Sequence, residues 1–468
     1  MISEIRIFNK IKNNGNYLLF ILLIAFLSFT LYKVFYFPVY IDEATTYNDY
    51  VSKGVWGVLS SYKEPNNHVL YSLFLVFFTK LPVDSLIAMR LLNVVLAVSS
   101  ILLMYQYLRE KYAVEIVFIS LFFFAFSYYF LFYAIFARGY MLLILCTISI
   151  FIVLDEIRYR SKQTKQFIYF CLISWVGFCT IPIFLYIYLS FVLIIGIRFF
   201  TKVYSVSLLV PFILSSFLTI VGVFLFYLPI LLHDGMDAII NNKWTVILSY
   251  QDVANYLSAA WLGFYDKIFG IRSCWIMALL ILFGIYYFIK KKESRVFLIQ
   301  HFSLLFLPFV FIFLHKVIPG SRTWSYLIVP FTLIIAFYLQ ELLLIKQISY
   351  YKKFFPILCF GLLFFLVTIF NKSHSHAGLK NDIYFGKVAQ FLVKKQASKI
   401  FFINGDSSYE SVIYTFYKKT TVNNVKEIKL ENDKFLYVGD LNVLKGLRKY
   451  EILYFDKNIH LCVYRILY

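Results

Sequence analysis

The sequence predicts a polytopic α-helical membrane protein with about 11 transmembrane helices, outer juxtamembrane helices and a small C-terminal extracytoplasmic α/β domain. Of its 468 residues, 61% are hydrophobic, and the mean hydropathy is +0.76, whereas a soluble domain is about half apolar. Apolar runs such as 17–36 exceed the roughly 18–20 residues that a helix needs to cross a bilayer. Basic and acidic loops also alternate between these runs, which is typical of multi-pass proteins.

The predicted spans follow the apolar runs in order. The first run is too long for a signal-peptide core and has no small-residue cleavage site, so we expect it to remain as an anchor. The stretch 167–197 is divided at Pro182, because proline breaks or bends a helix. The spans are 17–38, 85–107, 113–132, 139–154, 167–180, 183–197, 204–231, 271–289, 297–314, 325–343 and 354–370.

The loop charges predict the orientation of these spans. Basic clusters occupy every second loop and acidic residues occupy the others, and cytoplasmic loops are the ones that carry the excess of Lys and Arg. The alternation persists only if 167–197 crosses twice. It predicts a cytoplasmic N-terminus and an outer C-terminus. Examples of the basic group are Arg109, Lys111, Arg158, Arg160, Arg198, Lys202, Lys290 and Lys291, and examples of the acidic group are Asp42, Glu43, Asp49, Asp84, Asp234 and Asp252.

The chain divides into two predicted domains. Residues 1–370 form the transmembrane domain, and residues 371–468 form a soluble outer domain in which strand-like and helix-like runs alternate. The first outer loop, 39–84, contains the adjacent carboxylates Asp42 and Glu43. Within it, 68–81 is apolar but too short to span the bilayer, so we expect a helix in the outer interface.

Composition excludes several functions. The net charge of +20 is explained by topology and surface, and no nucleic-acid motif accompanies it, so the predicted surroundings are membrane lipids and not nucleic acid. The six cysteines form no Cys-x-x-Cys pair, which argues against a disulfide framework or a cysteine metal site. No glycine-rich nucleotide motif occurs. The sequence therefore indicates no cofactor, and it leaves a divalent metal open without indicating one.

Asp42-Glu43, just beyond the first span, is the leading catalytic candidate. A carboxylate against an apolar wall gains basicity by desolvation, and a neighbouring like charge raises it further. Such a group suits removal of a proton from an acceptor hydroxyl. The alternative is a solvated pair that ends a helix or sets topology.

Further polar residues occur at predicted outer boundaries of the membrane. Asn67, His68 and Tyr71 stand at the start of the interface helix, where helix N-termini attract anions and amides and imidazoles bind hydroxyls or phosphate; the alternative is helix capping. An arginine between apolar runs needs a partner, and a phosphate is a suitable one. The alternative is snorkelling to lipid headgroups. The arginines concerned are Arg90, Arg138 (followed by Tyr140) and Arg322.

In their order along the chain, these motifs resemble the GT-C glycosyltransferases, in the branch that contains protein O-mannosyltransferases and the bacterial lipid A aminoarabinose transferase. The resemblance covers the chain to about residue 330. It rests on Asp42-Glu43, Pro65-Asn66-Asn67-His68 with Leu70-Tyr71, Arg90-Leu91-Leu92, Ala137-Arg138-Gly139-Tyr140, and Arg322 with Pro330.

The resemblance implies a polyprenyl-phosphate sugar donor, an acceptor hydroxyl on a glycan, lipid or protein outside the cytoplasm, and Asp42 as the catalytic base. Two positions depart from the pattern. Phe136 stands where many relatives have an acidic residue two places before the arginine, and His68 stands where relatives commonly have a His-Pro-Pro-like sequence.

The leading hypothesis is therefore an inverting glycosyltransferase of the bacterial inner membrane, active on the outer face. Asp42 removes the acceptor proton, Glu43 positions or tunes Asp42, and Arg138 and Arg322 stabilise the leaving phosphate. Two other classes remain open, a polymerase or ligase of lipid-linked glycans and a transporter without chemistry. The residues expected at the donor phosphate or sugar are Asn67, His68, Tyr71, Arg90, Arg138, Tyr140 and Arg322.

Overall fold

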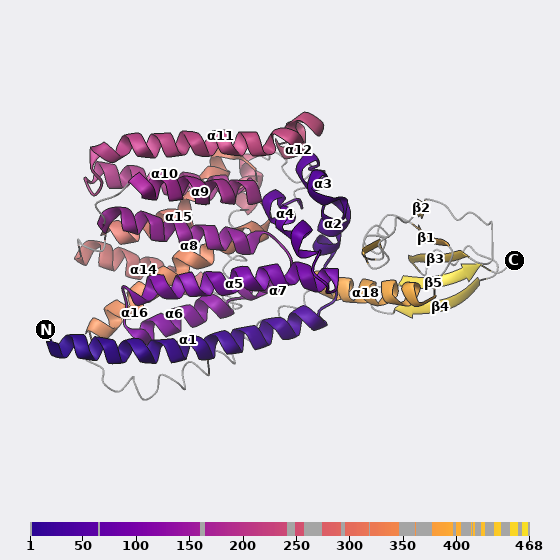
Figure 1. Cartoon of the computed structure of the whole chain (residues 1–468), viewed down its shortest axis with the longest axis horizontal. Helices are drawn as coiled ribbons and strands as arrows, with labels where there is room; N and C mark the ends of the chain where they lie inside the picture. The colour runs from indigo at the N-terminus through magenta and orange to yellow at the C-terminus, as the bar shows by residue number, and fades with distance from the viewer. Residues whose placement is uncertain are drawn as a thin grey trace.

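The computed structural model shows a bundle of long helices and a smaller unit with a β-sheet near the C-terminus (Figure 1). It describes residues 2–63, 66–159, 164–240, 249–256, 274–291, 295–317, 319–345, 361, 377–395, 399–403, 413, 415–416, 423–425, 435–440, 450–456 and 461–466.

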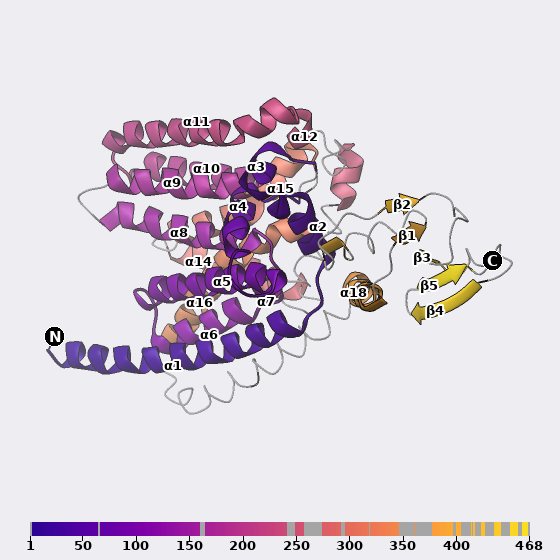
Figure 2. The same cartoon turned by 45° about the vertical axis from the view of Figure 1, so that its right-hand side comes forward.

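The bundle helices lie side by side in two views (Figures 1 and 2). Their apolar composition and helical length follow from the bilayer, in which the backbone must satisfy its hydrogen bonds within each helix. They are α1 (Ile2–Tyr36), α5 (Ser85–Arg109), α6 (Val114–Phe126), α7 (Tyr128–Ile135), α8 (Tyr140–Tyr159), α9 (Thr164–Thr180), α10 (Phe184–Phe200), α11 (Leu209–His233), α14 (Cys274–Lys290), α15 (Arg295–His315) and α16 (Ile328–Ile345).

The described residues include six helices that are long and apolar enough to cross a membrane, or seven if the bent pair α6–α7 is one span. Helices α9, α10 and α14 have 17 residues each and are shorter than those. The break predicted at Pro182 is present, since α9 ends at Thr180 and α10 begins at Phe184. The predicted multi-pass protein is confirmed. The count of eleven stays a prediction, and its last span, 354–370, lies outside the described residues except for position 361.

The expected span 113–132 is two helices and not one. At Ser127 the backbone is extended, with φ −64° and ψ 150°, and α6 and α7 meet at an angle of 55°. The hydroxyl of Ser127 donates to the carbonyl of Phe124 at 3.1 Å, so it occupies one acceptor left open at the helix end. The bend directs α7 toward the loop that contains Arg138.

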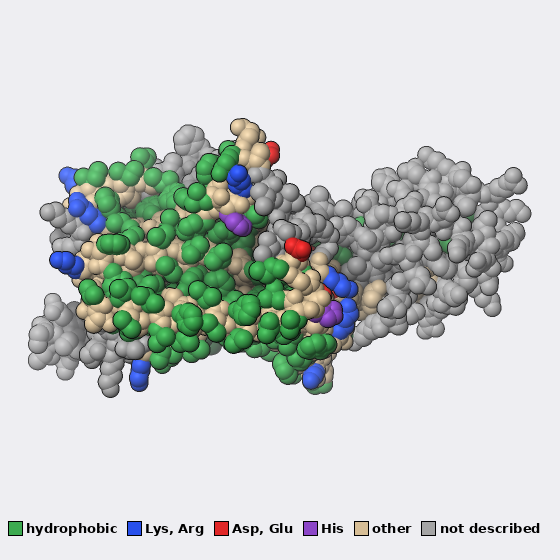
Figure 3. Space-filling view, turned by 90° about the horizontal axis from the view of Figure 1, so that it is seen from above, with side chains coloured by type: hydrophobic (Ala, Val, Ile, Leu, Met, Phe, Trp, Pro, Cys, Tyr) green, Lys and Arg blue, Asp and Glu red, His purple; other side chains and the backbone are tan. Residues whose placement is uncertain are grey.

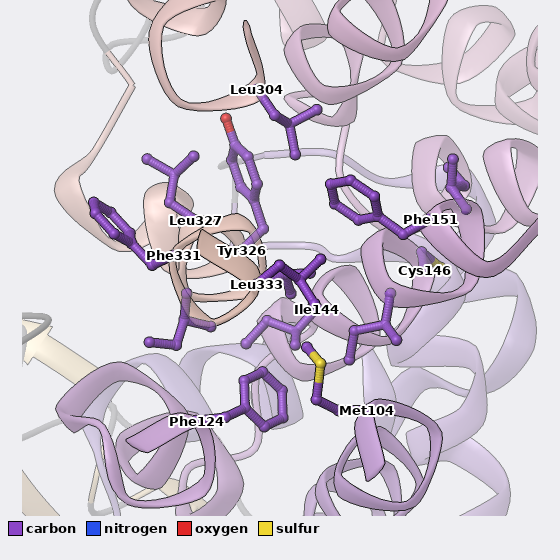
Figure 4. Close-up of a cluster of buried hydrophobic side chains, with 14 of the residues drawn as sticks. Met104, Phe124, Ile144, Cys146, Phe151, Leu304, Tyr326, Leu327, Phe331 and Leu333 are labelled. Carbon is purple, nitrogen blue, oxygen red and sulfur yellow. The ribbon is translucent and has the colours of Figure 1, made fainter. Parts of the chain in front are cut away.

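A large apolar core joins the helices (Figure 4). It contains side chains from α5, α6, α8, α15 and α16, and also from the short 3-10 helix η4 (Ser321–Leu327). Met104, Phe124, Ile144 and Leu327 are buried within it. Close packing makes such an interior resistant to deformation. The core therefore fixes η4, which includes Arg322, relative to the bundle.

At the end of the bundle where α5, α8 and α10 finish and α15 begins, a buried polar network connects these helices. Asp155 accepts a hydrogen bond of 2.6 Å from the Tyr107 hydroxyl and pairs with Lys111. Arg198 pairs with Asp155 at 3.2 Å and donates to Gln300. The charge pattern predicted these helix ends on one side of the membrane, and they do meet in the structure.

Asp155→Asn should destabilise the protein without changing the end of the bundle where Tyr140 lies. The Arg198 side chain is 4% exposed, and loss of a partner to a buried charged group costs on the order of 1–3 kcal/mol. Tyr140 lies 15 residues earlier on α8, which corresponds to roughly 22 Å of helix. We expect a lower melting temperature in detergent and unchanged binding of any ligand at the Tyr140 end of the bundle. Altered ligand binding there would contradict this separation.

At the opposite end of the bundle, short helices cover the helix ends. They are α2 (Ile41–Asp49), the 3-10 helix η1 (Val51–Lys53), α3 (Gly54–Ser60), α4 (Val69–Phe78) and α12 (Asp237–Ile240). The interface helix expected over 68–81 is α4, which has 10 residues. Its inner face buries Val69, Tyr71 and Leu75. Apolar side chains of these helices belong to a second buried cluster, which includes Ala44 and Val58.

The C-terminal part contains α18 (Ala377–Lys395) and a five-stranded sheet of order β2-β1-β3-β5-β4. Strand β1 is parallel to β2 and β3, and β5 is antiparallel to β3 and β4. Phe391 of α18 contacts Tyr454 with ring centroids 5.0 Å apart, and Phe416 contacts Tyr47 of α2 at 5.1 Å. The C-terminal part therefore contacts α2. The strands are β1 (Lys399–Ile403), β2 (Asn423–Val425), β3 (Phe435–Asp440), β4 (Tyr450–Asp456) and β5 (Leu461–Ile466).

One face of the bundle is broadly hydrophobic (Figure 3). Helix α11 contributes many exposed apolar side chains, among them Phe217, Ile220 and Phe224. A soluble monomer rarely exposes so large an apolar surface, whereas lipid tails cover it without cost. The exposed face is thus the lipid-facing surface of a multi-pass membrane protein.

Candidate active site

Glu43 and Arg90 form a fully buried ion pair, and both side chains are 0% exposed. Nε of Arg90 donates to Oε1 of Glu43 at 2.9 Å, and Nη2 donates to Oε2 at 2.6 Å. Glu43 also accepts the amide N–H of Tyr40 at 2.9 Å and that of Ala137 at 2.8 Å. Each carboxylate oxygen therefore has two donors, which is the satisfaction that a buried charge requires.

The remaining N–H groups of Arg90 also have protein partners. They donate to the carbonyls of Val34, Phe37 and Pro38 at 3.2, 2.8 and 2.7 Å. Arg90 thus ties the end of α1 to α2 and α5. The sequence placed Arg90 at the donor and Glu43 beside the base. In the structure, every N–H group of Arg90 and both oxygens of Glu43 are hydrogen-bonded to protein atoms. Their geometry is therefore that of residues that hold α1, α2 and α5 together, not of residues that contact a ligand.

Asp42 occupies the first turn of α2 beside Glu43, and it has a different environment. Its Oδ2 pairs with Arg322 and lies 3.9 Å from Nη2 of Arg138. Its side chain is 11% exposed, whereas Glu43 is inaccessible. Among the described residues, the other oxygen, Oδ1, accepts no hydrogen bond. Asp42 therefore combines a charge-paired oxygen with an open one.

Arg138 is 1% exposed and lies between α2 and the loop before α4. Nη2 donates to Oδ1 of Asn66 at 3.0 Å, and Nη1 donates to the Thr46 hydroxyl at 3.1 Å. Nη1 also approaches the carbonyl of Asp42 at 3.4 Å. The Nε atom is buried and has no partner in the described part of the chain. Arg138 is thus immobilised within the site.

Arg322 differs from Arg138 in both contacts and exposure. It belongs to η4, and its side chain is 37% exposed. Asp42 is its hydrogen-bond partner among the described residues. The phenol rings of Tyr40, Tyr133 and Tyr140 are close enough to its guanidinium to interact electrostatically. Arg322 is the cation of the site that remains accessible.

His68 is oriented by the loop that contains Arg138. Nδ1 accepts the amide N–H of Gly139 at 2.8 Å, so the proton of the neutral ring lies on Nε2, 3.3 Å from Nη2 of Arg138. Burial, followed by the charges of Arg138 and Arg322, lowers the pKa of His68 well below its ordinary value. The ring is therefore neutral near pH 7, which avoids a third positive charge at this point.

Gly139 and Tyr140 fix the position of this ring. A Cβ at Gly139 would lie 2.7 Å from Nδ1 of His68 and 2.9 Å from a methyl carbon of Thr180, and real Cβ atoms do not approach so closely. The ring of Tyr140 meets His68 edge to face, with centroids 4.9 Å apart. Glycine is required because the imidazole occupies the space of a side chain.

The other two expected site residues face the protein interior. Asn67 is 0% exposed and donates to the carbonyls of Val58 and Ser61 at 2.9 and 2.8 Å. Tyr71 is 1% exposed, and its hydroxyl has no partner in the described part of the chain. Burial and then the charge of Glu43 raise the pKa of Tyr71 well above its ordinary value. Asn67 thus holds the loop between α3 and α4, and the Tyr71 hydroxyl lies near the carboxylate of Glu43.

The sequence did not single out Asn93 or Thr46 as candidates for the site, and it named Asn66 only as part of the Pro65-Asn66-Asn67-His68 motif. Asn93, on α5, donates to the carbonyls of Tyr133 and Arg138 at 2.8 and 3.1 Å, and it thereby holds the loop after α7. A signal for Asn93 was available, since an amide three residues after Arg90 places two polar groups on one face of an apolar helix.

Phe136, the departure from the family pattern, is buried against the supporting pair. The guanidinium carbon of Arg90 lies 5.4 Å from the centre of its ring, and the ring contacts Phe37 and Tyr40 at 5.9 and 5.3 Å. A cation over an aromatic face is favourable. An apolar ring therefore packs on Arg90 at this position, and this turn does not contribute a second carboxylate.

The described residues contain no group of three or more His, Cys, Asp or Glu side chains that could hold a metal ion. Glu43 is fully paired with Arg90, and Asp42 is paired with Arg322. The chemistry that these residues offer is one carboxylate oxygen without a hydrogen-bond partner among the described residues, beside one partly exposed guanidinium.

Comparison with solved structures identifies the fold. Neither a protein-family model nor a curated protein matches the sequence. The structure is similar to ArnT from Cupriavidus metallidurans in the apo state, with a TM-score of 0.56, 10% identity and coverage of 94% of this chain and 97% of that chain. It is equally similar to ArnT bound to undecaprenyl phosphate, with a TM-score of 0.56, 9% identity and the same coverage. The resemblance inferred from the motifs is confirmed at the level of fold, because the chain has the fold of the GT-C glycosyltransferase ArnT.

Proposed function

We propose that this protein is an inverting glycosyltransferase that moves a sugar from a polyprenyl-phosphate donor to an acceptor hydroxyl on the extracytoplasmic face. The observation that supports this most is Asp42, a carboxylate with an open Oδ1 next to the partly exposed guanidinium of Arg322. A base and a phosphate-binding cation side by side are the two groups that this transfer requires.

In the proposed step, Oδ1 of Asp42 takes the proton of the acceptor hydroxyl. The acceptor oxygen forms a bond to the anomeric carbon from the face opposite the phosphate. The bond between that carbon and the phosphate oxygen breaks, and its electron pair leaves with polyprenyl phosphate. The proton on Asp42 then passes to water. Attack from the opposite face inverts the anomeric carbon.

The arginines have different roles in this proposal. Arg322 binds the phosphate, because a guanidinium matches phosphate oxygens bidentately and its side chain is accessible. Arg138 fixes Asp42 through Thr46 and Asn66 and adds positive charge near the leaving group. Glu43 and Arg90 position the helix of Asp42. His68 and Tyr140 form the wall of the site, and Asn67 and Tyr71 lie behind it.

The similar structure of ArnT supports a lipid-phosphate donor, since that protein is described with undecaprenyl phosphate bound. At an identity of 9%, the similarity supports the same fold but does not identify the sugar or the acceptor. We place the protein in a bacterial inner membrane with eleven spans, a cytoplasmic N-terminus and residues 371–468 as an outer domain. Glycans, lipids and proteins are the acceptor classes to test.

The direct experiment is release of polyprenyl phosphate from synthetic polyprenyl-phosphate sugars by the full-length protein in nanodiscs. We expect release that depends on an added acceptor and on Asp42. A donor panel of hexoses, pentoses and amino sugars would identify the sugar. No release across the panel by folded protein would overturn the proposal in favour of a glycan ligase or a transporter.

A further inference from the structure

Two arginines approach the same oxygen of Asp42, but they are held very differently. Arg138 is 1% exposed and has Asn66, Thr46 and the Asp42 carbonyl as partners. Arg322 is 37% exposed and has Asp42 as its hydrogen-bond partner among the described residues. Movement of Arg138 would break several buried hydrogen bonds, whereas movement of Arg322 breaks one ion pair. Arg322 is the cation that can change partners.

A phosphate is a competitor for that cation. Carboxylates and phosphates present the same pair of oxygens to a guanidinium, and both accept charge-assisted hydrogen bonds. The pair joins a buried carboxylate to a partly exposed guanidinium, with side chains 11% and 37% exposed. A phosphodiester presents two non-bridging oxygens that share one negative charge, and it can therefore compete with the carboxylate for the exposed side of the guanidinium. After displacement, Arg138 remains 3.9 Å from Oδ2 of Asp42 and keeps that side chain in place.

We propose that Arg322 couples donor binding to the release of the base. Without a donor, Arg322 pairs with Oδ2 of Asp42. The donor phosphate takes Arg322, and the carboxylate of Asp42, freed from this ion pair, then accepts the acceptor proton. This inference rests on the proposed function. It predicts an ordered reaction in which the donor binds before the acceptor is deprotonated, so the unoccupied site does not carry a free base and a free cation together.

Competition has a thermodynamic signature, because coupling between two interactions is reciprocal. If Asp42 competes with phosphate for Arg322, removal of the carboxylate should tighten phosphate binding. We expect Asp42→Asn to bind polyprenyl phosphate about fivefold or more tightly than the wild type, as coupling of this kind typically amounts to 5–150-fold. Arg322→Gln should bind it more weakly. In the Arg322→Gln background, Asp42→Asn should change the affinity less than about twofold. A change of that size is within the ordinary error with which the effects of two independent substitutions add.

The measurement is the Kd for polyprenyl phosphate of the full-length protein in phosphatidylcholine nanodiscs, with polyprenol and phosphatidylglycerol as additional ligands. Polyprenol has no phosphate, so its affinity should not change with Asp42→Asn or Arg322→Gln. Phosphatidylglycerol distinguishes a donor site from a general site for lipid headgroups, because only a general site would show the same affinity changes with this lipid. Asp237→Asn is the matched control, since Asp237 is an exposed outer aspartate. Arg322→Lys replaces Arg322→Gln if the latter does not fold, and it should give a smaller coupling than the wild type.

Two results would overturn the coupling. In the first, Asp42→Asn leaves the affinity unchanged or weakens it. In the second, Asp42→Asn tightens binding equally with and without Arg322, which indicates simple charge repulsion. Either result leaves the proposed function intact if release of polyprenyl phosphate still requires Asp42. Absence of both binding and release would overturn the proposed function itself.

Discussion

Asp42→Asn should abolish sugar transfer while leaving the protein folded. Asparagine has the same shape as aspartate but cannot take a proton from a hydroxyl, and a positioned base typically contributes about 10²–10⁴ in rate. We therefore expect kcat to fall by a factor on the order of 10²–10⁴. The measurement is acceptor-dependent release of polyprenyl phosphate, compared at equal amounts of folded protein.

Asp237→Asn provides the control for this experiment. It makes the same chemical change at an exposed position and should retain the rate of the wild type. Turnover by Asp42→Asn within a few-fold of the wild type would remove Asp42 as the base. The same preparation tests the coupling, because tighter binding of polyprenyl phosphate should accompany the lost turnover.

Glu43→Gln should act mainly on stability. We expect it to destabilise the part of the bundle around α2 and to have a smaller effect on any chemical step. In the structure, one oxygen of Glu43 accepts from Nε of Arg90 and the amide of Ala137, and the other accepts from Nη2 of Arg90 and the amide of Tyr40. A glutamine would place its own NH2 group against two of these donors. Breaking a buried ion pair by removing one partner costs about 3–5 kcal/mol. We expect a clearly lower melting temperature and protease sensitivity around residue 40.

Glu110→Gln is the matched control, since Glu110 is exposed and follows α5, the helix of Arg90. It should melt at the temperature of the wild type. Arg90→Gln should resemble Glu43→Gln, because either change leaves the opposite charge buried without its partner. A Glu43→Gln protein that melts normally but loses turnover would show instead that Glu43 acts in the chemistry.

Much of the architecture was predictable because it depends on local hydrophobicity. The apolar runs that lie within the described residues are helices of the bundle, and the proline at 182 lies in the break between α9 and α10. The short apolar run after His68 is a helix of 10 residues. Each of these features is decided by the length of an apolar run or by the missing N–H of proline. The bend at Ser127 was not predicted, since no proline or glycine marks it.

The sequence by itself determined that the chain crosses a membrane several times and that Asp42, Glu43, His68, Arg138 and Arg322 stand at the ends of apolar runs on one side. Only the tertiary structure decided which of them share a contact. It separated two adjacent carboxylates, pairing Glu43 with Arg90 at 0% exposure and placing Asp42, whose side chain is 11% exposed, beside Arg322. The reason is geometric. Neighbours on a helix point in different directions, and the partners lie 47 and 280 positions away along the chain, where no local pattern of residues can specify a contact.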